Sequence, residues 1–191
     1  MLAAVGHDVV AVEPLEEMLD QLRANVPGVE ALVGSAEQIP LGDESADAVV
    51  AAQAFHWFDE AVALPEIARV LRPGGVIGLI WNTRDDREPW VVRLSQLTGD
   101  DADWNEEEVA APLVASPHFH DVEWRTFRNA QRVDRATLVD LVASRSYAAT
   151  LAPRERRRLL DSVGAFFDEA AGGGEELELP YLVYAFRATR L

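Results

Sequence analysis

Apolar residues in the first 82 positions follow two alternating patterns. Short apolar runs, which are typical of buried strands, predict strands at 7–12, 29–33, 46–52 and 76–81. Between them, apolar residues recur every three or four positions, as on one face of a helix. This spacing predicts helices at 14–26 and 59–71. Alternating strands and helices predict a parallel sheet with right-handed crossovers, which is an α/β fold.

The pattern changes after Asn82. An acidic stretch predicts irregular structure with short helices at 85–117. Alternating apolar and polar residues then predict two antiparallel strands, at 122–127 and 179–186. Helical spacing predicts two helices between them, at 136–144 and 153–171. We therefore expect a single domain over 1–191, with a C-terminal hairpin edge and a helical insert in its variable part, 83–191.

Glu13 closes the first predicted strand. In Rossmann-like nucleotide-binding folds, an acid after the second strand accepts hydrogen bonds from the ribose hydroxyls. The glycine-rich turn of such folds lies roughly 20 residues before that acid, but only twelve residues precede Glu13. We expect the first strand, its helix and the glycine-rich turn to be absent. A start codon assigned too far downstream explains this better than a shortened paralogue, and the chain as given is expected to bind its cofactor weakly.

Composition excludes several kinds of chemistry. The chain has no cysteine, and all of its 17 basic residues are arginine. Thiolate nucleophiles, sulfur-ligated metals, Schiff-base lysines and phosphate-loop lysines are therefore excluded, and no metal is expected. A net charge of −16 disfavours nucleic acid. No apolar stretch is long enough for a membrane span and no signal peptide is evident, so we expect a cytoplasmic protein without a membrane partner. The pattern does not determine the oligomeric state.

Four segments in this order resemble class I S-adenosylmethionine-dependent methyltransferases of the UbiE/type-11, small-molecule kind. They are VVAVEP at 9–14, GSAEQIP at 34–40, AQAFHWF at 52–58 and RVLRPGG at 69–75. The resemblance covers residues 2–82, and the remainder fits as the variable C-terminal part. It implies a Rossmann-like methyltransferase fold with a mostly parallel sheet. It also implies S-adenosylmethionine as the cofactor and a small molecule as the methyl acceptor.

The resemblance also implies a set of cofactor-binding residues. Each part of the cofactor would meet residues that follow one strand. The ribose would meet Glu13 and Pro14, the adenine would meet Ser35, Ala36 and Glu37, and the methionine part would meet Gln53 and Ala54. Ser35 stands where this family often has an aspartate. Glu37 is then the candidate acceptor for the adenine amino group, the alternative being a surface glutamate in a turn.

Candidates for catalysis and acceptor binding follow the third and fourth strands. His56 is a packed histidine, a wall of the cofactor pocket, or a general base that takes a proton from the acceptor. Trp57 is an interior tryptophan or a lid over the sulfonium, since a cation gains energy beside an aromatic face. Trp81 and Asn82 would border the acceptor site, with Tyr147 as a further candidate.

Two other functions fit part of the pattern. A nicotinamide-dependent oxidoreductase also uses an acid after its second strand, and a non-catalytic binding or regulatory protein could have this fold. Four arginines at 154–158 admit two interpretations: the solvated face of an amphipathic helix, or recognition of an acidic small molecule.

Overall fold

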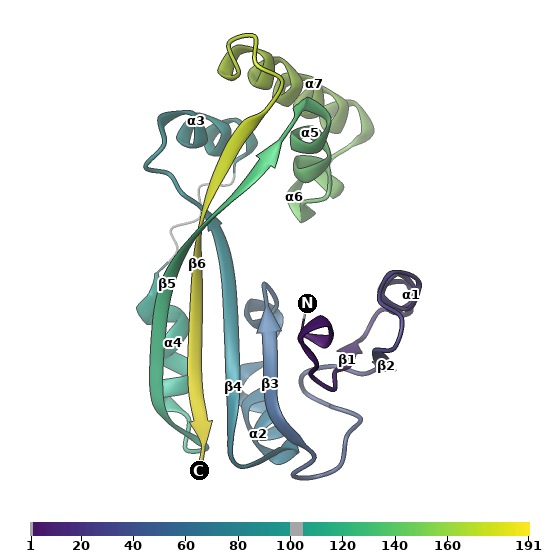
Figure 1. Ribbon diagram of the computed structural model, residues 1–191, viewed down its shortest axis with the longest axis vertical. Helices are drawn as coiled ribbons and strands as arrows, with labels where there is room; N and C mark the ends of the chain where they lie inside the picture. The colour runs from purple at the N-terminus through teal and green to yellow at the C-terminus, as the bar shows by residue number, and fades with distance from the viewer. Residues whose placement is uncertain (1, 100–104) are drawn as a thin grey trace. The chain divides into compact units, whose positions relative to one another are not determined.

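The computed structural model describes residues 2–99 and 105–191, so part of the predicted irregular stretch at 85–117 lies outside the described residues (Figure 1). The chain divides into two compact units. Unit 1 comprises 1–80, 106–125 and 185–191, and unit 2 comprises 81–105 and 126–184. The functional division into 1–82 and 83–191 remains a prediction.

Unit 1 begins with a short 3-10 turn, Ala3–Val5, and a two-stranded parallel sheet. β1 (Val10–Glu13) pairs with β2 (Glu30–Val33), and α1 (Glu16–Asn25) connects them. Each element starts one to three residues later than predicted. Leu19 on α1 is buried, whereas the preceding Met18 is 57% exposed.

A second sheet has the strand order β3-β4-β6-β5. β3 (Ala46–Ala52) matches its prediction and pairs in parallel with β4 (Leu71–Arg84). The crossover contains a 3-10 turn, η2 (Phe55–Trp57), and α2 (Glu60–Val70). Asp59 caps α2: its carboxylate accepts a hydrogen bond from the Ala61 amide at 3.2 Å. Leu64, Ile67 and Ala68 on the inner face of α2 are buried.

β1 and β3 belong to different sheets, so each has an edge with no strand pairing to it among the described residues. The apolar run of β3 predicted a strand covered on both faces. That prediction is wrong for β3, because Ala51 is its one buried residue and Val50 is 47% exposed. An edge strand has less cover than a strand with neighbours on both sides.

The Pro73-Gly74-Gly75 turn lies inside β4, which begins at Leu71 rather than at residue 76. Gly74 has a φ of 76°, a conformation that side chains rarely adopt. A Cβ on Gly75 would lie 2.8 Å from the Arg72 carbonyl oxygen, so no larger residue fits there. Extended backbone on both sides of this turn belongs to one strand.

The two C-terminal strands are adjacent and run in opposite directions, with β5 at the edge of the sheet (Figure 1). β5 (Phe119–Val133) and β6 (Leu177–Arg190) confirm the predicted hairpin edge, although both are longer than predicted. α4 (Glu106–Ala115) precedes β5 and belongs to unit 1.

Unit 2 contains the helical insert. α5 (Arg135–Ala143) and α7 (Pro153–Ala170) confirm the two predicted helices to within one residue at each end. α3 (Pro89–Thr98) provides one of the expected short helices, and α6 (Ser146–Ala149) was not predicted. Their apolar faces form one core with the ends of β5 and β6, made of Val91, Leu94, Val133, Leu138, Val142, Val163, Phe166, Phe167, Leu179 and Tyr181. Across 2–99 and 105–191, the structure contains no helix long and apolar enough to cross a membrane.

Candidate functional site

Glu13 ends β1 at the carboxyl edge of the small parallel sheet. Its side chain is half-buried, and Oε1 accepts a hydrogen bond from the Leu15 amide at 3.1 Å. Oε2 has no hydrogen-bond donor among the described residues. A carboxylate held at one oxygen and open at the other suits a hydroxyl-bearing ligand. Pro14 follows and is exposed.

The turn after β2 lies beside Glu13. The Gly34 amide donates to the Glu13 carbonyl at 3.3 Å, which joins the two strand ends. A Cβ on Gly34 would lie 2.7 Å from Pro40 Cδ and 3.0 Å from Val12 Cγ1, so this close approach requires glycine. Ser35 and Gln38 then exchange backbone hydrogen bonds across the turn, at 3.2 and 3.3 Å.

Glu37 connects this turn to the start of α2 by a hydrogen bond. Its Oε1 accepts a hydrogen bond from the Asp59 amide at 3.0 Å. That bond, and then a second from the Ser35 hydroxyl, hold the pKa of Glu37 below its usual value. The carboxylate is therefore ionised at neutral pH, and it is half-buried within the turn. Its contact with adenine remains a prediction.

The end of β3 contributes Gln53 and Ala54. Gln53 has a φ of 52°, which is uncommon for a residue other than glycine. Its amide donates to the Ile80 carbonyl at 2.9 Å, and this bond to β4 holds the unusual conformation in place. Backbone held in a sparsely populated conformation often marks a functional turn, and here it reverses the chain into η2.

His56 and Trp57 lie on η2 and both are exposed. Their rings are in contact, with centroids 4.9 Å apart. Trp57 is 73% exposed, so the alternative of an interior tryptophan is wrong, and His56 is not a packed core histidine. The third aromatic residue of η2, Phe55, supplies the anchor, because it is 2% exposed and contacts Phe58 edge-on.

The remaining acceptor candidates belong to unit 2. Trp81 is 6% exposed, so the structure places it in the interior rather than on an accessible wall. Asn82 follows and is half-buried. Tyr147 packs against the core of unit 2, and its buried hydroxyl has no hydrogen-bond partner among the described residues. Unit 1 thus contains Glu13, Ser35, Ala36, Glu37 and the residues of η2. Trp81, Asn82 and Tyr147 belong to unit 2.

Sequence reasoning missed a pair on α2 that holds the next part of the turn. Glu66 Oε1 accepts a hydrogen bond from the Ile39 amide at 2.8 Å. Arg69 donates to the Ile39 and Leu41 carbonyls at 3.1 and 3.0 Å and pairs with Glu66 and with Asp43. Glu66 and Arg69 are three residues apart on α2, but Ile39, Leu41 and Asp43 lie 26 to 30 residues from Arg69, so no local pattern could have revealed these contacts with the turn.

Contact of these residues with the adenosine half of S-adenosylmethionine remains a prediction. Glu13 has one carboxylate oxygen open, and Ile39 beside the Ser35 turn is buried. Within residues 2–99, no Gly-x-Gly-x-Gly turn is available to approach the methionine half.

Comparison with known proteins identifies the family. A sequence profile described as a methyltransferase domain matches residues 1–79. An uncharacterized methyltransferase from Mycobacterium tuberculosis is 48% identical over 187 residues, which is 96% of this chain and 75% of the relative. Another, from Schizosaccharomyces pombe, is 38% identical over 161 residues, or 83% of this chain and 64% of the relative.

Solved structures give the same answer for the fold. A type II methyltransferase structure from Anaeromyxobacter dehalogenans superposes with a TM-score of 0.68 at 28% identity, covering 99% of this chain and 83% of that one. The architecture is therefore the Rossmann-like methyltransferase fold. The chain belongs to the class I S-adenosylmethionine-dependent methyltransferases.

Proposed function

We propose that this protein binds S-adenosylmethionine through its adenosine half and transfers the methyl group to a small molecule. The observation that carries the proposal is the position of Glu13. Its carboxylate ends a parallel strand, keeps one oxygen open, and lies next to the Ser35–Gln38 turn through the Gly34–Glu13 hydrogen bond. Ligands of open α/β sheets bind at the carboxyl ends of the strands.

Methyl transfer requires little chemistry from the side chains. The cofactor supplies a methyl group that is already activated by its sulfonium, so the protein chiefly aligns the two reactants and excludes water. The exposed ring of Trp57 could cover the reacting groups, and His56 beside it could accept a proton from the acceptor. Tyr147 and Asn82 remain candidates for the acceptor side, whereas Trp81 would act only by supporting its neighbours.

We also propose that tight binding needs one more strand. The free edges of β1 and β3 could both pair with a strand placed between them, and the turn after that strand would meet the methionine half. Without this additional strand, the 191-residue chain would hold only the adenosine half of the cofactor. Its affinity for the cofactor and its activity would then be low. The proposal depends on the two unpaired edges and on the open side of Glu13.

The alternatives receive less support. A nicotinamide-dependent oxidoreductase shares the acid after the second strand, but the relatives are methyltransferases. A non-catalytic protein of this fold would keep the nucleotide site and lose methyl transfer. Incubation with S-adenosylmethionine labelled on its methyl group, followed by analysis of small-molecule extracts for label, distinguishes that protein from an enzyme.

The role of Glu13 can be tested with nucleosides. We expect wild-type protein to bind adenosine roughly tenfold more tightly than 2′-deoxyadenosine, because a hydrogen bond to a charged group is worth about 1.5–3 kcal/mol. Glu13→Gln should bind the two nucleosides with similar affinity, as measured by titration in NMR spectra.

Glu17→Gln is the matched control, since Glu17 is an exposed acid in the first turn of α1. This variant should keep the wild-type preference. Equal loss of the preference in both variants, or no preference in the wild-type protein, would show that Glu13 does not hold the ribose.

A further inference from the structure

A cavity of about 670 Å³ lies in unit 2 between α6 and the first half of α7. Its wall on α7 is a single helix face, since the residues recur at spacings of three and four. The connection between the two helices and the end of α6 complete it. The lining residues are Ala149, Leu151, Pro153, Arg156, Arg157, Leu160 and Asp161.

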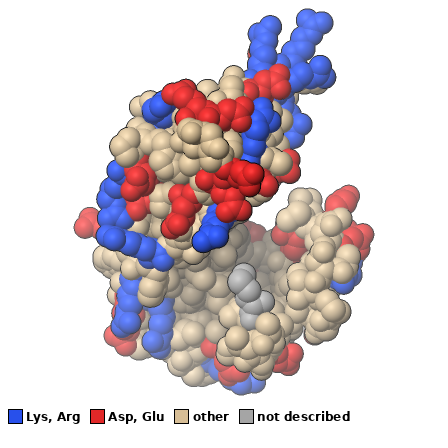
Figure 2. All heavy atoms as spheres, turned by 45° about the horizontal axis from the view of Figure 1, so that its top comes forward, with Lys and Arg blue, Asp and Glu red and all other residues tan. Residues whose placement is uncertain are grey.

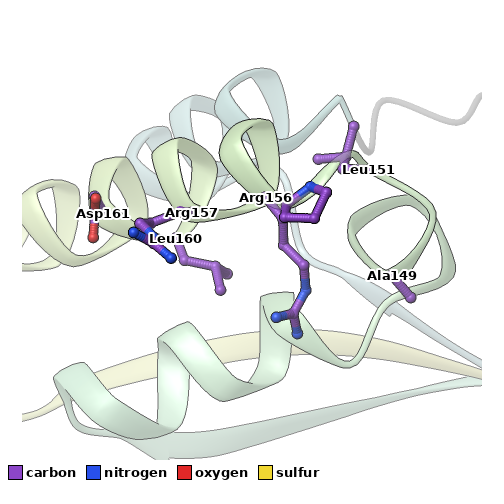
Figure 3. A pocket seen from close by; sticks show the side chains of 7 residues that line it. Ala149, Leu151, Arg156, Arg157, Leu160 and Asp161 are labelled. Carbon is purple, nitrogen blue, oxygen red and sulfur yellow. The ribbon is translucent and has the colours of Figure 1, made fainter.

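The cavity combines an apolar wall with positive charge. Figure 3 shows Arg157 and Leu160 close together on α7, and Arg156 extending from α7 past the end of the neighbouring helix. Arg156 Nη2 donates to the Ala143 carbonyl at 3.3 Å, a neutral acceptor that leaves the charge uncompensated. Arg157 is exposed and forms no ion pair within the described ranges. With Asp161, the lining carries one net positive charge.

Some arginines of the same unit have carboxylate partners: Arg93 pairs with Glu169 and Arg135 with Asp168. Arg156 and Arg157 pair with no carboxylate among the described residues, although the chain has a net charge of −16. Figure 2 shows acidic side chains spread over the visible face, with several basic side chains projecting together at one end. A cluster of unpaired guanidinium groups attracts anions by its local potential, even when the net charge is negative.

The first turn of α7 has no side-chain cap but contains one acidic residue. Ala152 is the N-cap residue and has no side-chain acceptor for the helix, and Pro153 and Glu155 lie in the first turn. Glu155 offsets the positive end of the helix dipole, so the positive charge of the cavity comes from the two arginines. This end lies at the cavity, because Pro153 lines it.

We infer that this cavity binds a small molecule with one carboxylate attached to an aliphatic body. The guanidinium of Arg157 would hold the carboxylate, with Arg156 beside it, since arginine pairs well with a planar carboxylate. Leu151, Leu160 and Ala149 would contact the aliphatic body. The carboxylate of Asp161 disfavours a dianion such as phosphate. This inference does not depend on methyl transfer.

Hexanoate is a suitable probe, with acetate, hexanol and inorganic phosphate as comparisons. The full chain is titrated without any cofactor and followed by calorimetry and by amide NMR signals. We expect hexanoate to bind about tenfold or more tightly than acetate, because its additional methylenes leave water. Hexanol should bind at least tenfold more weakly than hexanoate, since it lacks the charge. Signals of Ala149, Leu151 and Leu160 should shift.

Arg157→Gln should weaken hexanoate binding about tenfold. Arg158→Gln is the matched control, because it makes the same change of charge at the next position of α7, outside the cavity lining. It should weaken binding less than about twofold. Both sites are exposed, so both variants should fold.

Four results would overturn the inference. They are no binding of hexanoate, equal affinities for hexanoate and hexanol, equal losses in the two arginine variants, and displacement of hexanoate by an equal concentration of phosphate. Since the experiment contains no cofactor, each of these results leaves the proposed methyl transfer untouched.

Discussion

Two tryptophans that the sequence suggested for the acceptor site have opposite surroundings. Trp57 is 73% exposed on η2, whereas Trp81 is 6% exposed. We expect Trp57→Ala to change the free energy of unfolding by less than about 0.5 kcal/mol, because it removes few contacts. Trp81→Ala should lower it by about 3–5 kcal/mol, as for other buried aromatic residues. Urea denaturation measures both, and equal effects would contradict the different burial of these two side chains.

Asp85 gives unit 2 a pH-dependent contribution to its stability. The carboxylate is buried and accepts hydrogen bonds from the Arg87 side chain and amide. The Arg87 side chain is the main cause that lowers the pKa of Asp85 below its usual value. A pKa lowered by folding adds stability above the pKa of the unfolded chain, and this stability is lost as the pH falls through the folded pKa.

Asp85→Asn should therefore lower the free energy of unfolding by about 1–3 kcal/mol at pH 7, and by progressively less below about pH 4. Asp86→Asn is the matched control, because Asp86 is exposed and adjacent in sequence. Denaturation curves at several pH values give the comparison. A difference in the free energy of unfolding between Asp85→Asn and wild type that stays constant down to pH 2 would contradict this prediction. It would show that the Asp85–Arg87 ion pair is not the source of the pH dependence.

The chemical types of the site residues could be anticipated, but their partners could not. An acid after an apolar strand is a local pattern, and it led to Glu13. The bond between Glu37 and the Asp59 amide joins residues 22 positions apart and depends on how the chain folds back. The exposure of side chains could not be predicted either, since the sequence alone does not show that Trp57 is exposed and Trp81 is buried.

At the level of elements, α2 acts as the support for the loop that follows β2. Glu66 and Arg69 bond to the backbone of Ile39 and Leu41. We expect Arg69→Gln to increase amide hydrogen exchange of Ile39 and Leu41 roughly tenfold, because the loop can then open locally. Arg72→Gln, two residues beyond α2, should leave these amides unchanged, since Arg72 bonds to Glu44 and Asp47 instead. Unchanged exchange in Arg69→Gln would contradict the supporting role.

Helices with strong periodicity were predictable to within a residue or two, whereas the full length of the edge strand β5 was not. The spacing of α2, α5 and α7 reflects a buried face, which the sequence records directly. β5 is exposed along most of its length, so its second half has no alternating pattern and only its pairing in the sheet keeps it extended. α6 has only four residues, too few to establish a period.

At the scale of the whole molecule, the described strands form two separate sheets. The order β3-β4-β6-β5 and the parallel pair β1–β2 agree with the methyltransferase fold. We propose that the described residues hold the adenosine half of the cofactor, and the edges of β1 and β3 are unpaired among them. We therefore predict that the methionine half of the cofactor contributes little to binding in this chain.

Titration calorimetry with adenosine and with S-adenosylmethionine, on the same protein, tests that claim most directly. We predict that both ligands bind and that their dissociation constants agree within about threefold. This corresponds to a difference in binding free energy of less than about 0.7 kcal/mol. Binding of S-adenosylmethionine at least tenfold tighter than adenosine, or no binding of adenosine at all, would contradict it.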